Sequence, residues 1–363
     1  MQISPDGNAT LRFHDFALAK CRRVKRSEMG INMHNKKKKL LVAVSVIMVL
    51  VILLIGAFEI TKAIGKKRLQ SRMVTSPGRV KYQNTLYEYN DDILTFLVMG
   101  IDKGKETFEP WETDDGNSGQ ADALFLTVLD TTGKTIKVIG INRNTMTDID
   151  FYDEESNYLT TFPAQIALQY AYGNNREESC AYQLETVKKL FYNLPIHGYA
   201  AVNIDAVPVI NDTVGGVDVE VLEDLTRADE SLVKGRQIHL IGESAYWYVK
   251  YRDINLFASV DMRTMRQAQY LDGFIEAATH SVKSNPFVAL QLYHEIAPQM
   301  TTDLSFPEIL YLASILPQYQ FDEQSFHQVT GITAMGEEYE EFYPDEATLF
   351  ELILDIFYIE NEN

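Results

Sequence analysis

Two aspartates stand at the ends of a long connection between apolar runs of the sequence. Asp102 closely follows the run Ile93–Met99, and Asp122 directly precedes the run Ala123–Leu129. Either residue alone is typical of a turn, but the connection of 19 residues between them is uncommonly long, and such loops are often functional. Mg²⁺ binds one or two carboxylates together with phosphate oxygens. If both carboxylates face one cleft, the pair is a candidate Mg²⁺ site.

Positive charge is scarce in the larger part of the chain. Residues 1–79 hold 16 Lys and Arg against 4 Asp and Glu, and residues 80–363 hold 17 against 47, which gives net charges of +12 and −30. A part this acidic repels nucleic acid, so we expect no DNA or RNA partner. An anionic ligand could bind only where several of these few cations gather.

Five cations are candidates for such a cluster. One follows the apolar run Ile136–Ile141, and the others lie in a short stretch more than 100 residues later. A solvated helix face beside Asp253 and Asp261 would also explain the later group, but a domain this acidic has little reason to concentrate its arginines. Guanidinium groups bind phosphate oxygens in a bidentate manner. The candidates are Arg143, Lys250, Arg252, Arg263 and Arg266.

A membrane segment is predicted near the amino terminus. Leu40–Phe58 is a run of 19 residues without a charge, and as a helix it would span roughly 30 Å, the thickness of the bilayer core. A cleaved signal peptide is the alternative, but its apolar region is usually shorter, and Ala57-Phe58-Glu59 is a poor cleavage site. The basic residues that flank the run favour a cytoplasmic amino terminus if residues 1–32 are translated. If translation starts at Met33 instead, the charges on the two sides of the run do not favour this orientation.

The two cysteines, Cys21 and Cys180, stand on opposite sides of this run. We therefore expect no disulfide, and we expect Cys180 to be a small buried residue.

The predicted domains are a cytoplasmic segment (1–39), a transmembrane helix (40–58), a juxtamembrane linker (59–90) and an extracytoplasmic domain (91–363). Three unalternated apolar runs within residues 93–141 predict central strands buried on both faces. With the helices this indicates an α/β fold, a three-layer α/β/α sandwich around a mostly buried β-sheet. The predicted helices are Ala181–Tyr192, Ala206–Val214, Ser244–Tyr251, Met262–His280, Pro286–Gln299, Phe306–Leu316 and Ala347–Tyr358, and Val217–Val221 is a further predicted strand.

Six short stretches, in order after the apolar run, resemble the LytR-CpsA-Psr family of membrane-anchored glycopolymer phosphotransferases. Each is a weak signal alone, and their order makes them specific. They are Leu97-Val98-Met99-Gly100-Ile101-Asp102, Ala121-Asp122-Ala123-Leu124, Ile141-Asn142-Arg143-Asn144-Thr145, Asn211-Asp212-Thr213-Val214-Gly215-Gly216-Val217, Tyr248-Val249-Lys250-Tyr251-Arg252, and Asp261-x-Arg263-x-x-Arg266-Gln267.

The resemblance implies a specific reaction. A glycopolymer phosphate, from teichoic acid or capsule, would pass from an undecaprenyl-pyrophosphate carrier to a peptidoglycan hydroxyl outside the cell membrane of a Gram-positive bacterium. Asp102 and Asp122 would hold Mg²⁺, and the lipid would lie in an apolar tunnel between the sheet and the helices. The phosphates would be bound by Arg143, Lys250, Arg252, Arg263 and Gln267. Catalysis would depend on Arg143, Asp122 and Arg252, and a pyrophosphatase side activity would be compatible with the same residues. We expect Arg266 to be structural, because two arginines at this spacing cannot reach equally deep.

Three positions depart from the family pattern. Gln120 stands where an arginine is usual, Asn144 replaces an aspartate, and Lys250 replaces an arginine. Lys250 keeps the charge without the fork, whereas Asn144 lacks a carboxylate that could orient Arg143 or accept a proton. The alternative hypothesis is therefore a non-catalytic or weakly catalytic scaffold that binds polyprenyl pyrophosphate. A role in transcription would rest only on the basic segment 20–39, whose ordinary explanation is a membrane flank.

Overall fold

The computed structural model divides the chain into two compact units, Met1–Thr61 and Lys62–Asn363, and the second carries the features discussed below. Most of the predicted membrane segment 40–58 lies outside the described residues, and none of the helices within them combines the length and apolar character needed to cross a bilayer. The structure describes residues 53, 55–72, 76–102, 119–153, 155–253, 256–257, 259–285, 287–321 and 324–361.

The second unit is organised around a mixed sheet of six strands in the order β11-β8-β3-β4-β5-β12. The three apolar runs of the sequence form β3, β4 and β5. The middle strand β4 is antiparallel to both of its neighbours, while β8 is parallel to β3 and β12 is parallel to β5. The strand bounds are β3 Ile93–Ile101, β4 Ala121–Asp130, β5 Thr135–Ile141, β8 Tyr199–Asn203, β11 Met300–Thr302 and β12 Phe326–Gln328.

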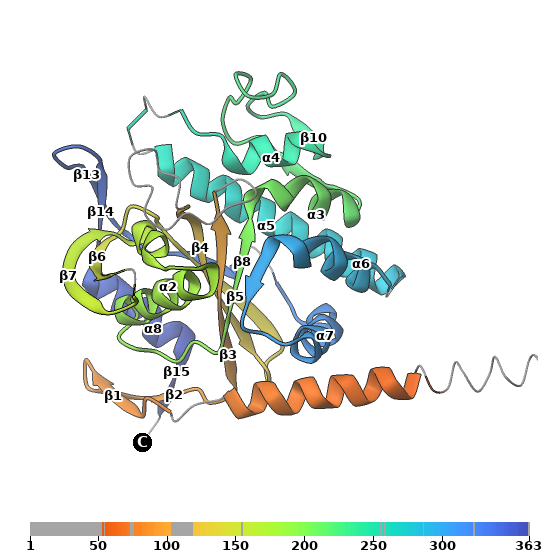
Figure 1. Ribbon diagram of the computed structural model, residues 1–363, viewed down its shortest axis with the longest axis horizontal. Coiled ribbons are helices and arrows are strands. Elements are labelled where there is room, and N and C mark those ends of the chain that lie inside the picture. The colour runs from red at the N-terminus through yellow and green to blue at the C-terminus, as the bar shows by residue number, and fades with distance from the viewer. Residues whose placement is uncertain are drawn as a thin grey trace, which may run out of the picture. The chain divides into compact units, whose positions relative to one another are not determined.

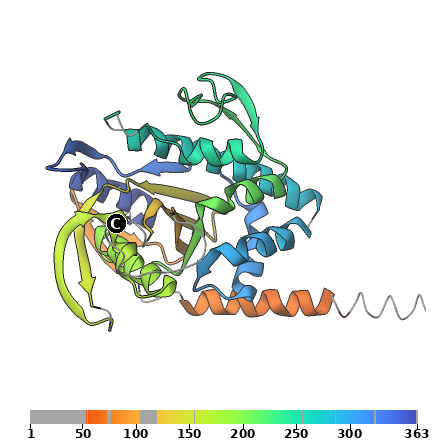
Figure 2. The ribbon, with the colours of Figure 1, turned by 45° about the horizontal axis from the view of Figure 1, so that its top comes forward.

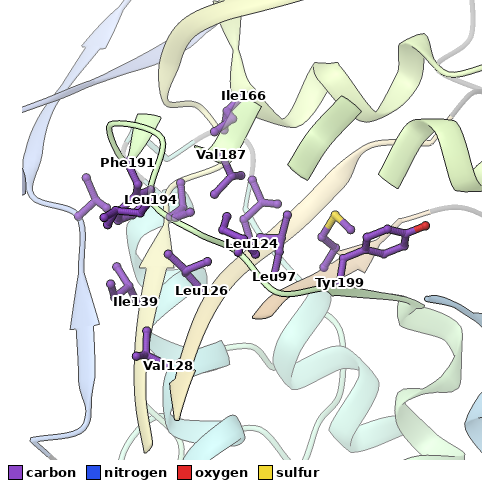
Figure 3. Packing of buried hydrophobic residues seen from close by; sticks show 14 of the residues in the cluster. Leu97, Leu124, Leu126, Val128, Ile139, Ile166, Val187, Phe191, Leu194 and Tyr199 are labelled. Carbon is purple, nitrogen blue, oxygen red and sulfur yellow. The ribbon is translucent and has the colours of Figure 1, made fainter. Parts of the chain in front are cut away.

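The central strands are buried on both faces, as their continuous apolar sequences predict. Leu97 and Met99 of β3 pack with helices α2 (Arg176–Leu190) and α8 (Glu346–Phe357) on one face, and Figure 3 shows Leu97 beside Leu124 and Leu126. Alternate residues of the same strand, Leu94 and Phe96, face the opposite way. They pack with α5 (Ser259–Ser284) and α7 (Phe306–Ile315), so that helices cover both faces (Figure 1).

The helices agree with the prediction apart from their ends. The largest shift is in α2, which begins at Arg176, five residues before the predicted start, because the Asn175 side chain accepts a hydrogen bond from the Glu178 amide and caps the helix. Cys180 within it is buried and free, as predicted. The remaining helices are η1 Ile166–Tyr172, η2 Ile204–Ala206, α3 Val207–Thr213, α4 Glu243–Lys250, α6 Phe287–Ile296, η3 Ala297–Gln299 and η4 Leu316–Gln318.

Several peripheral strands were not predicted. The predicted linker 59–90 in fact contains helical residues 59–72 and two strands. The two strands pair with each other, and the second also pairs with a strand at the far end of the chain, a contact that no local pattern reveals. The strand predicted at Val217–Val221 is present as β9 Val217–Glu220. The other peripheral strands are β1 Arg79–Tyr82, β2 Thr85–Tyr89, β6 Met146–Tyr152, β7 Tyr158–Gln165, β10 Gln237–Leu240, β13 Gly331–Met335, β14 Glu340–Pro344 and β15 Tyr358–Asn361.

Candidate functional site

A β-bulge brings the two predicted metal aspartates together at the same end of the central strands β3 and β4. Gly100 of β3 pairs with Ala123 of β4, but Ile101 pairs with Ala121, so Asp122 is the extra residue of the bulge. The amides of Asp102 and Asp122 both donate to the carbonyl oxygen of Gln120, over 3.3 and 3.0 Å. The two aspartates therefore leave the backbone side by side.

Asp122 lies between two arginines. Its Oδ1 is 2.9 Å from Nε of Arg143, and its Oδ2 is 3.4 Å from Nη1 of Arg263. Arg143 follows the neighbouring strand β5 and also donates to the side-chain oxygen of Gln120, whereas Arg263 comes from the first turn of α5. The site thus joins a β-strand end with a helix that begins about 120 residues later in the sequence.

Asp102 is paired with Lys250, the last residue of α4, over 2.9 Å. The ammonium group also donates to the Tyr246 hydroxyl over 2.6 Å and lies 5.0 Å from the centre of that ring. Burial alone would lower the pKa of Lys250, but the hydrogen bonds to Asp102 and Tyr246 outweigh it and raise the pKa. Lys250 therefore stays charged at neutral pH.

The arginines lower one another's pKa. Burial, followed by the charges of Arg143, Arg252 and Arg266, lowers the pKa of Arg263 to about 10, although Asp122 acts in the opposite direction. Burial and then Arg252 also lower the pKa of Arg143. Arg252 is thus close enough to act on both arginines.

Arg263 retains unused hydrogen-bonding capacity. Its side chain is 7% exposed, and its Nε and Nη2 find no acceptor among the described residues. Buried donors of a charged group are costly to leave unpaired. Three cations (Arg143, Lys250 and Arg263) pair with two aspartates, and Arg252 is close enough to act on two of them. The unused donors of Arg263 therefore suit an anion with several oxygens.

Arg266 and Gln267 have a structural role that sequence reasoning only half anticipated. Arg266 is fully buried, lies 2.8 Å from a Glu223 oxygen, and donates to the carbonyls of Tyr248 and Tyr251. Gln267 donates its amide to the Val249 carbonyl over 3.1 Å, and its role as a phosphate donor remains a prediction. The two side chains satisfy the carbonyls at the end of α4 and so fix the segment that carries Lys250 and Arg252.

Asn142 is a site residue that sequence reasoning missed as such. It is buried, its side-chain oxygen accepts from the Asn144 amide, and its side-chain nitrogen donates to Asp261, each over 2.9 Å. Burial raises the pKa of Asp261, while hydrogen bonds from Asn142 and Thr333 act to lower it. Asn142 thereby fixes the turn that presents Arg143, and its place directly after a buried strand was the available signal.

The aspartates fit a magnesium ion only in combination with ligand oxygens. Among the described residues there is no group of three or more His, Cys, Asp or Glu side chains placed to hold a metal. Two neighbouring carboxylates nevertheless suit Mg²⁺, since this ion completes its shell with phosphate oxygens and water. The Mg²⁺ site at Asp102 and Asp122 remains a prediction.

An apolar cavity of about 450 Å³ lies against the same sheet. It is enclosed by β3, β4, β5 and β8 together with α5, α6 and α7, and it shares β4 and α5 with the charged site. Its walls include Val98, Thr127, Ala200, Leu271, Leu292 and Leu312. Helix α5 and strand β4 therefore carry residues of the charged site at one end and line the apolar cavity farther along.

The chain is similar to two characterised transferases. It is 24% identical over 288 residues to the polyisoprenyl-teichoic acid–peptidoglycan teichoic acid transferase TagV of Bacillus subtilis strain 168, covering 78% of this chain and 68% of TagV. It is 26% identical over 215 residues to TagU of Bacillus cereus, a transferase of the same description, covering 59% of this chain and 62% of TagU. The similarity thus spans about two thirds or less of each relative.

The fold is also similar to solved structures. The crystal structure of B. subtilis TagV matches with a TM-score of 0.53 and 24% identity, over 73% of this chain and 95% of that one. A structure of TagT bound to LI-WTA matches with a TM-score of 0.53 and 18% identity, over 73% and 89%. At these identities the structures establish the mixed α/β fold. The sequence profile of the LytR_cpsA_psr family matches residues 50–353, most of the chain, and the chain therefore belongs to that family.

Proposed function

We propose that this protein is a glycopolymer phosphotransferase that moves a teichoic-acid-type polymer from undecaprenyl pyrophosphate to a peptidoglycan hydroxyl. The observation that carries the proposal is the surplus of buried and half-buried cations beside Asp102 and Asp122, at a site that shares β4 and α5 with the apolar cavity. A ligand with a phosphate head and a long apolar chain matches both parts. The described activities of TagV and TagU support the choice of polymer and acceptor.

The residues of the chain would divide the work as follows. Arg263 would donate its unused Nε and Nη2 hydrogens to pyrophosphate oxygens, while Arg143 and Arg252 would stabilise the charge that develops on the transferred phosphoryl group and on the leaving lipid phosphate. Lys250 would act as a point charge beside the metal position. Asp102 and Asp122 would hold Mg²⁺, which when bound would neutralise charge on the phosphate oxygens.

The reaction would be a substitution at phosphorus. The acceptor hydroxyl oxygen forms a bond to the polymer-bearing phosphorus, the bond from that phosphorus to the bridging oxygen breaks, and undecaprenyl phosphate leaves with the bonding electrons. The hydroxyl proton is released to solvent. Catalysis would come mainly from positioning and charge stabilisation, as in other phosphoryl transfers.

We also propose that the protein is anchored by Leu40–Phe58, with its amino terminus in the cytoplasm and residues 91–363 outside. Protease added to intact protoplasts is then expected to remove the large domain. If the domain is protected until the membrane is opened, this topology is wrong.

A non-catalytic scaffold that binds polyprenyl pyrophosphate is the second candidate, and Asn144 favours it. This residue directly follows Arg143, is 4% exposed, and provides no titratable group where the family pattern has a carboxylate. A scaffold would need the cations and the cavity but no acceptor site.

The two candidates can be separated with the full-length protein in vesicles. Labelled polyprenyl-pyrophosphate-linked teichoic acid, Mg²⁺ and purified peptidoglycan are supplied, and polymer attachment and release of polyprenyl phosphate are measured together with binding. A transferase produces both products, and Asp122→Asn abolishes them. Tight binding with neither product supports the scaffold, and release without attachment indicates a pyrophosphatase. Absence of binding contradicts both candidates.

A further inference from the structure

Helix α6, which forms the outer wall of the apolar cavity, carries apolar residues both toward the cavity and on its exposed side. Leu292 and Tyr293 of α6 line the cavity, yet no residue of α6 is buried. On the outer side of the helix, Phe287 is 77% and Leu290 is 53% exposed. They are three residues apart and therefore share a face. A helix with apolar residues on both sides is usually buried on both sides, so a binding partner is expected to cover the exposed side of α6.

The exposed apolar surface continues onto α7. Phe306, the first residue of α7, is 41% exposed, and its ring centre lies 5.1 Å from that of Tyr293 in α6. Single exposed apolar residues are ordinary, but a group on adjoining helices marks an interaction site. We call Phe287, Leu290 and Phe306 the outer apolar face.

A basic helix is packed directly beside this face. In residues 62–72, which belong to the same compact unit, Leu69 is buried in the cluster that contains Tyr311 and Leu312 of α7. A Cβ atom on Gly65 would lie 1.9 Å from the carbonyl oxygen of Pro307, so the helix backbone almost touches the start of α7. Both views show this orange helix next to α7 (Figures 1 and 2).

The helix adds positive charge to the apolar face. Lys66, Lys67 and Arg68 are exposed, and in the sequence they follow the uncharged run Leu40–Phe58 by only a few residues. Exposed basic residues beside apolar side chains are typical of a surface that contacts anionic lipid headgroups. Residues 80–363 carry a net charge of −30, so an anionic bilayer would repel most of the remaining surface, and the basic group formed by Lys66, Lys67 and Arg68 is exceptional.

A second copy of the chain is a poorer occupant. A symmetric dimer places the same patch of both copies together, so the two sets of Lys66, Lys67 and Arg68 would lie near each other and repel. Stable interfaces also bury about 800 Å² on each partner, more than three apolar side chains provide. A bilayer meets neither difficulty.

We propose that the outer apolar face, with Lys66, Lys67 and Arg68, rests on the membrane surface, so that α6 and α7 form the wall through which a prenyl chain passes between bilayer and cavity. The membrane contact is argued from this surface alone, whereas the identity of the cavity's ligand rests on the proposed function. The two statements can therefore fail separately.

The contact is tested with the full-length protein in vesicles of phosphatidylcholine and phosphatidylglycerol. Cys21 is changed to Ser, Cys180 is left in place because it is buried, and Phe287→Cys or Leu290→Cys is labelled with an environment-sensitive fluorophore. The matched control is Ile332→Cys on β13, where the native residue is 73% exposed. The expected result is a blue-shifted emission that doxyl-labelled lipids quench at 287 and 290 and leave unchanged at 332.

Other outcomes overturn the proposal. Labels at 287 and 332 that behave alike, quenched or not, show that the outer apolar face has no specific membrane contact. A blue shift that rises with protein density and resists lipid quenching shows a second copy as the occupant. Neither outcome depends on whether the protein is a transferase.

A second variant tests the passage of the lipid. Phe287→Asp combined with Leu290→Asp is expected to lower release of polyprenyl phosphate from a long-chain carrier in vesicles at least fivefold, with unchanged turnover of a water-soluble short-chain analogue. Ile332→Asp is the control and is expected to change neither. Equal losses with both substrates, or no loss with either, contradict the passage.

Discussion

The two ends of β3 lie beside two different arginine networks. Near its amino end, Arg72 contacts Glu308 over 2.6 Å and Asp303 over 2.7 Å, and it also donates to the carbonyls of His197 and Asp303. Every nitrogen of this guanidinium group has an acceptor. At the carboxyl end, Arg263 shares Asp122 with Arg143, and two of its nitrogens have no acceptor among the described residues.

The difference separates structural from ligand-binding charge. At the amino end one cation meets two acids and neighbouring carbonyls, so nothing is missing when the protein is alone. At the carboxyl end three cations pair with two acids and Arg252 lies near two of these cations, so an added anion can balance the surplus of positive charge. Substitutions at the first end should therefore change stability, and substitutions at the second end should change binding.

The largest effect is expected for Arg72→Ala. Glu308 is only 2% exposed, so removing Arg72 leaves a buried carboxylate without a counter-ion, held only by the hydrogen bonds from Ser305. The substitution should lower the free energy of unfolding by about 3–4 kcal/mol, the lower part of the range for a broken buried pair. Denaturant titration measures this. Arg79→Ala is the control, because the Arg79–Glu88 pair is exposed and should contribute about 0–1 kcal/mol. Equal losses for the two variants would contradict the assignment of Arg72 as structural.

Acid should destabilise the amino end through His197. Burial, and then the charge of Arg72, lowers the pKa of His197 to about 4. The Thr95 amide also donates to Nδ1 of the ring, which must be unprotonated to accept, so the folded protein holds the neutral ring. The unfolded chain binds the proton near its ordinary pKa of about 6.5. Stability should therefore be unaffected by this residue above pH 6.5 and fall by about 3 kcal/mol as the pH drops from 6.5 to 4.

Unfolding of the wild type and of His197→Asn at several pH values tests this expectation. The variant lacks the titrating ring, so its stability should change less with pH over that interval. Parallel pH profiles for the two proteins would show that His197 is not responsible.

At the carboxyl end, Arg263→Ala should act on binding. Loss of charged hydrogen bonds to a buried phosphate costs about 1.5–3 kcal/mol, which corresponds to roughly 10- to 150-fold weaker binding of polyprenyl pyrophosphate. Arg143→Ala and Arg252→Ala should behave similarly. Arg263→Ala should lower the free energy of unfolding by only about 1 kcal/mol, the ordinary effect of a substitution, because Asp122 keeps its ion pair with Arg143.

Binding can be measured by calorimetry with a short-chain analogue, with Arg236→Ala as the control that removes an exposed positive charge. A similar loss for Arg236→Ala would mean that only the overall charge of the domain matters. The contrast between the two ends of β3 would also be contradicted if Arg263→Ala unfolded the protein while the remaining folded fraction kept its affinity for the ligand.

The smallest effect is expected for Lys250→Arg. A guanidinium fork at the end of α4 could bind a phosphate in a bidentate manner, so affinity and transfer should stay the same or rise by roughly two- to fivefold, a fraction of the strength of a charged hydrogen bond. Lys234→Arg, at an exposed position, should have no effect. A fall of tenfold or more would show that the fit of the ammonium group between Asp102 and Tyr246 is essential.

Local sequence patterns identified the central elements because their signals are strong and local. The runs that form β3, β4 and β5 are apolar throughout, since helices cover both faces of the sheet, and the expected mixed α/β architecture is confirmed. The pattern failed for β1 and β2, which are held by pairing with β15 at the far end of the chain. Their residues carry no comparable apolar run.

For the site, the sequence by itself determined which residues could act: two aspartates beside buried strands, and a few cations in an acidic domain that must gather if they are to bind an anion. Only the tertiary structure decided their states. The bulge at Asp122 arises from a register shift between two strands, and Arg266 and Gln267 donate to carbonyl groups at the end of α4. Residue type fixes the charge and donors of a side chain, but which donors remain free depends on neighbours that the chain brings in from more than 100 residues away.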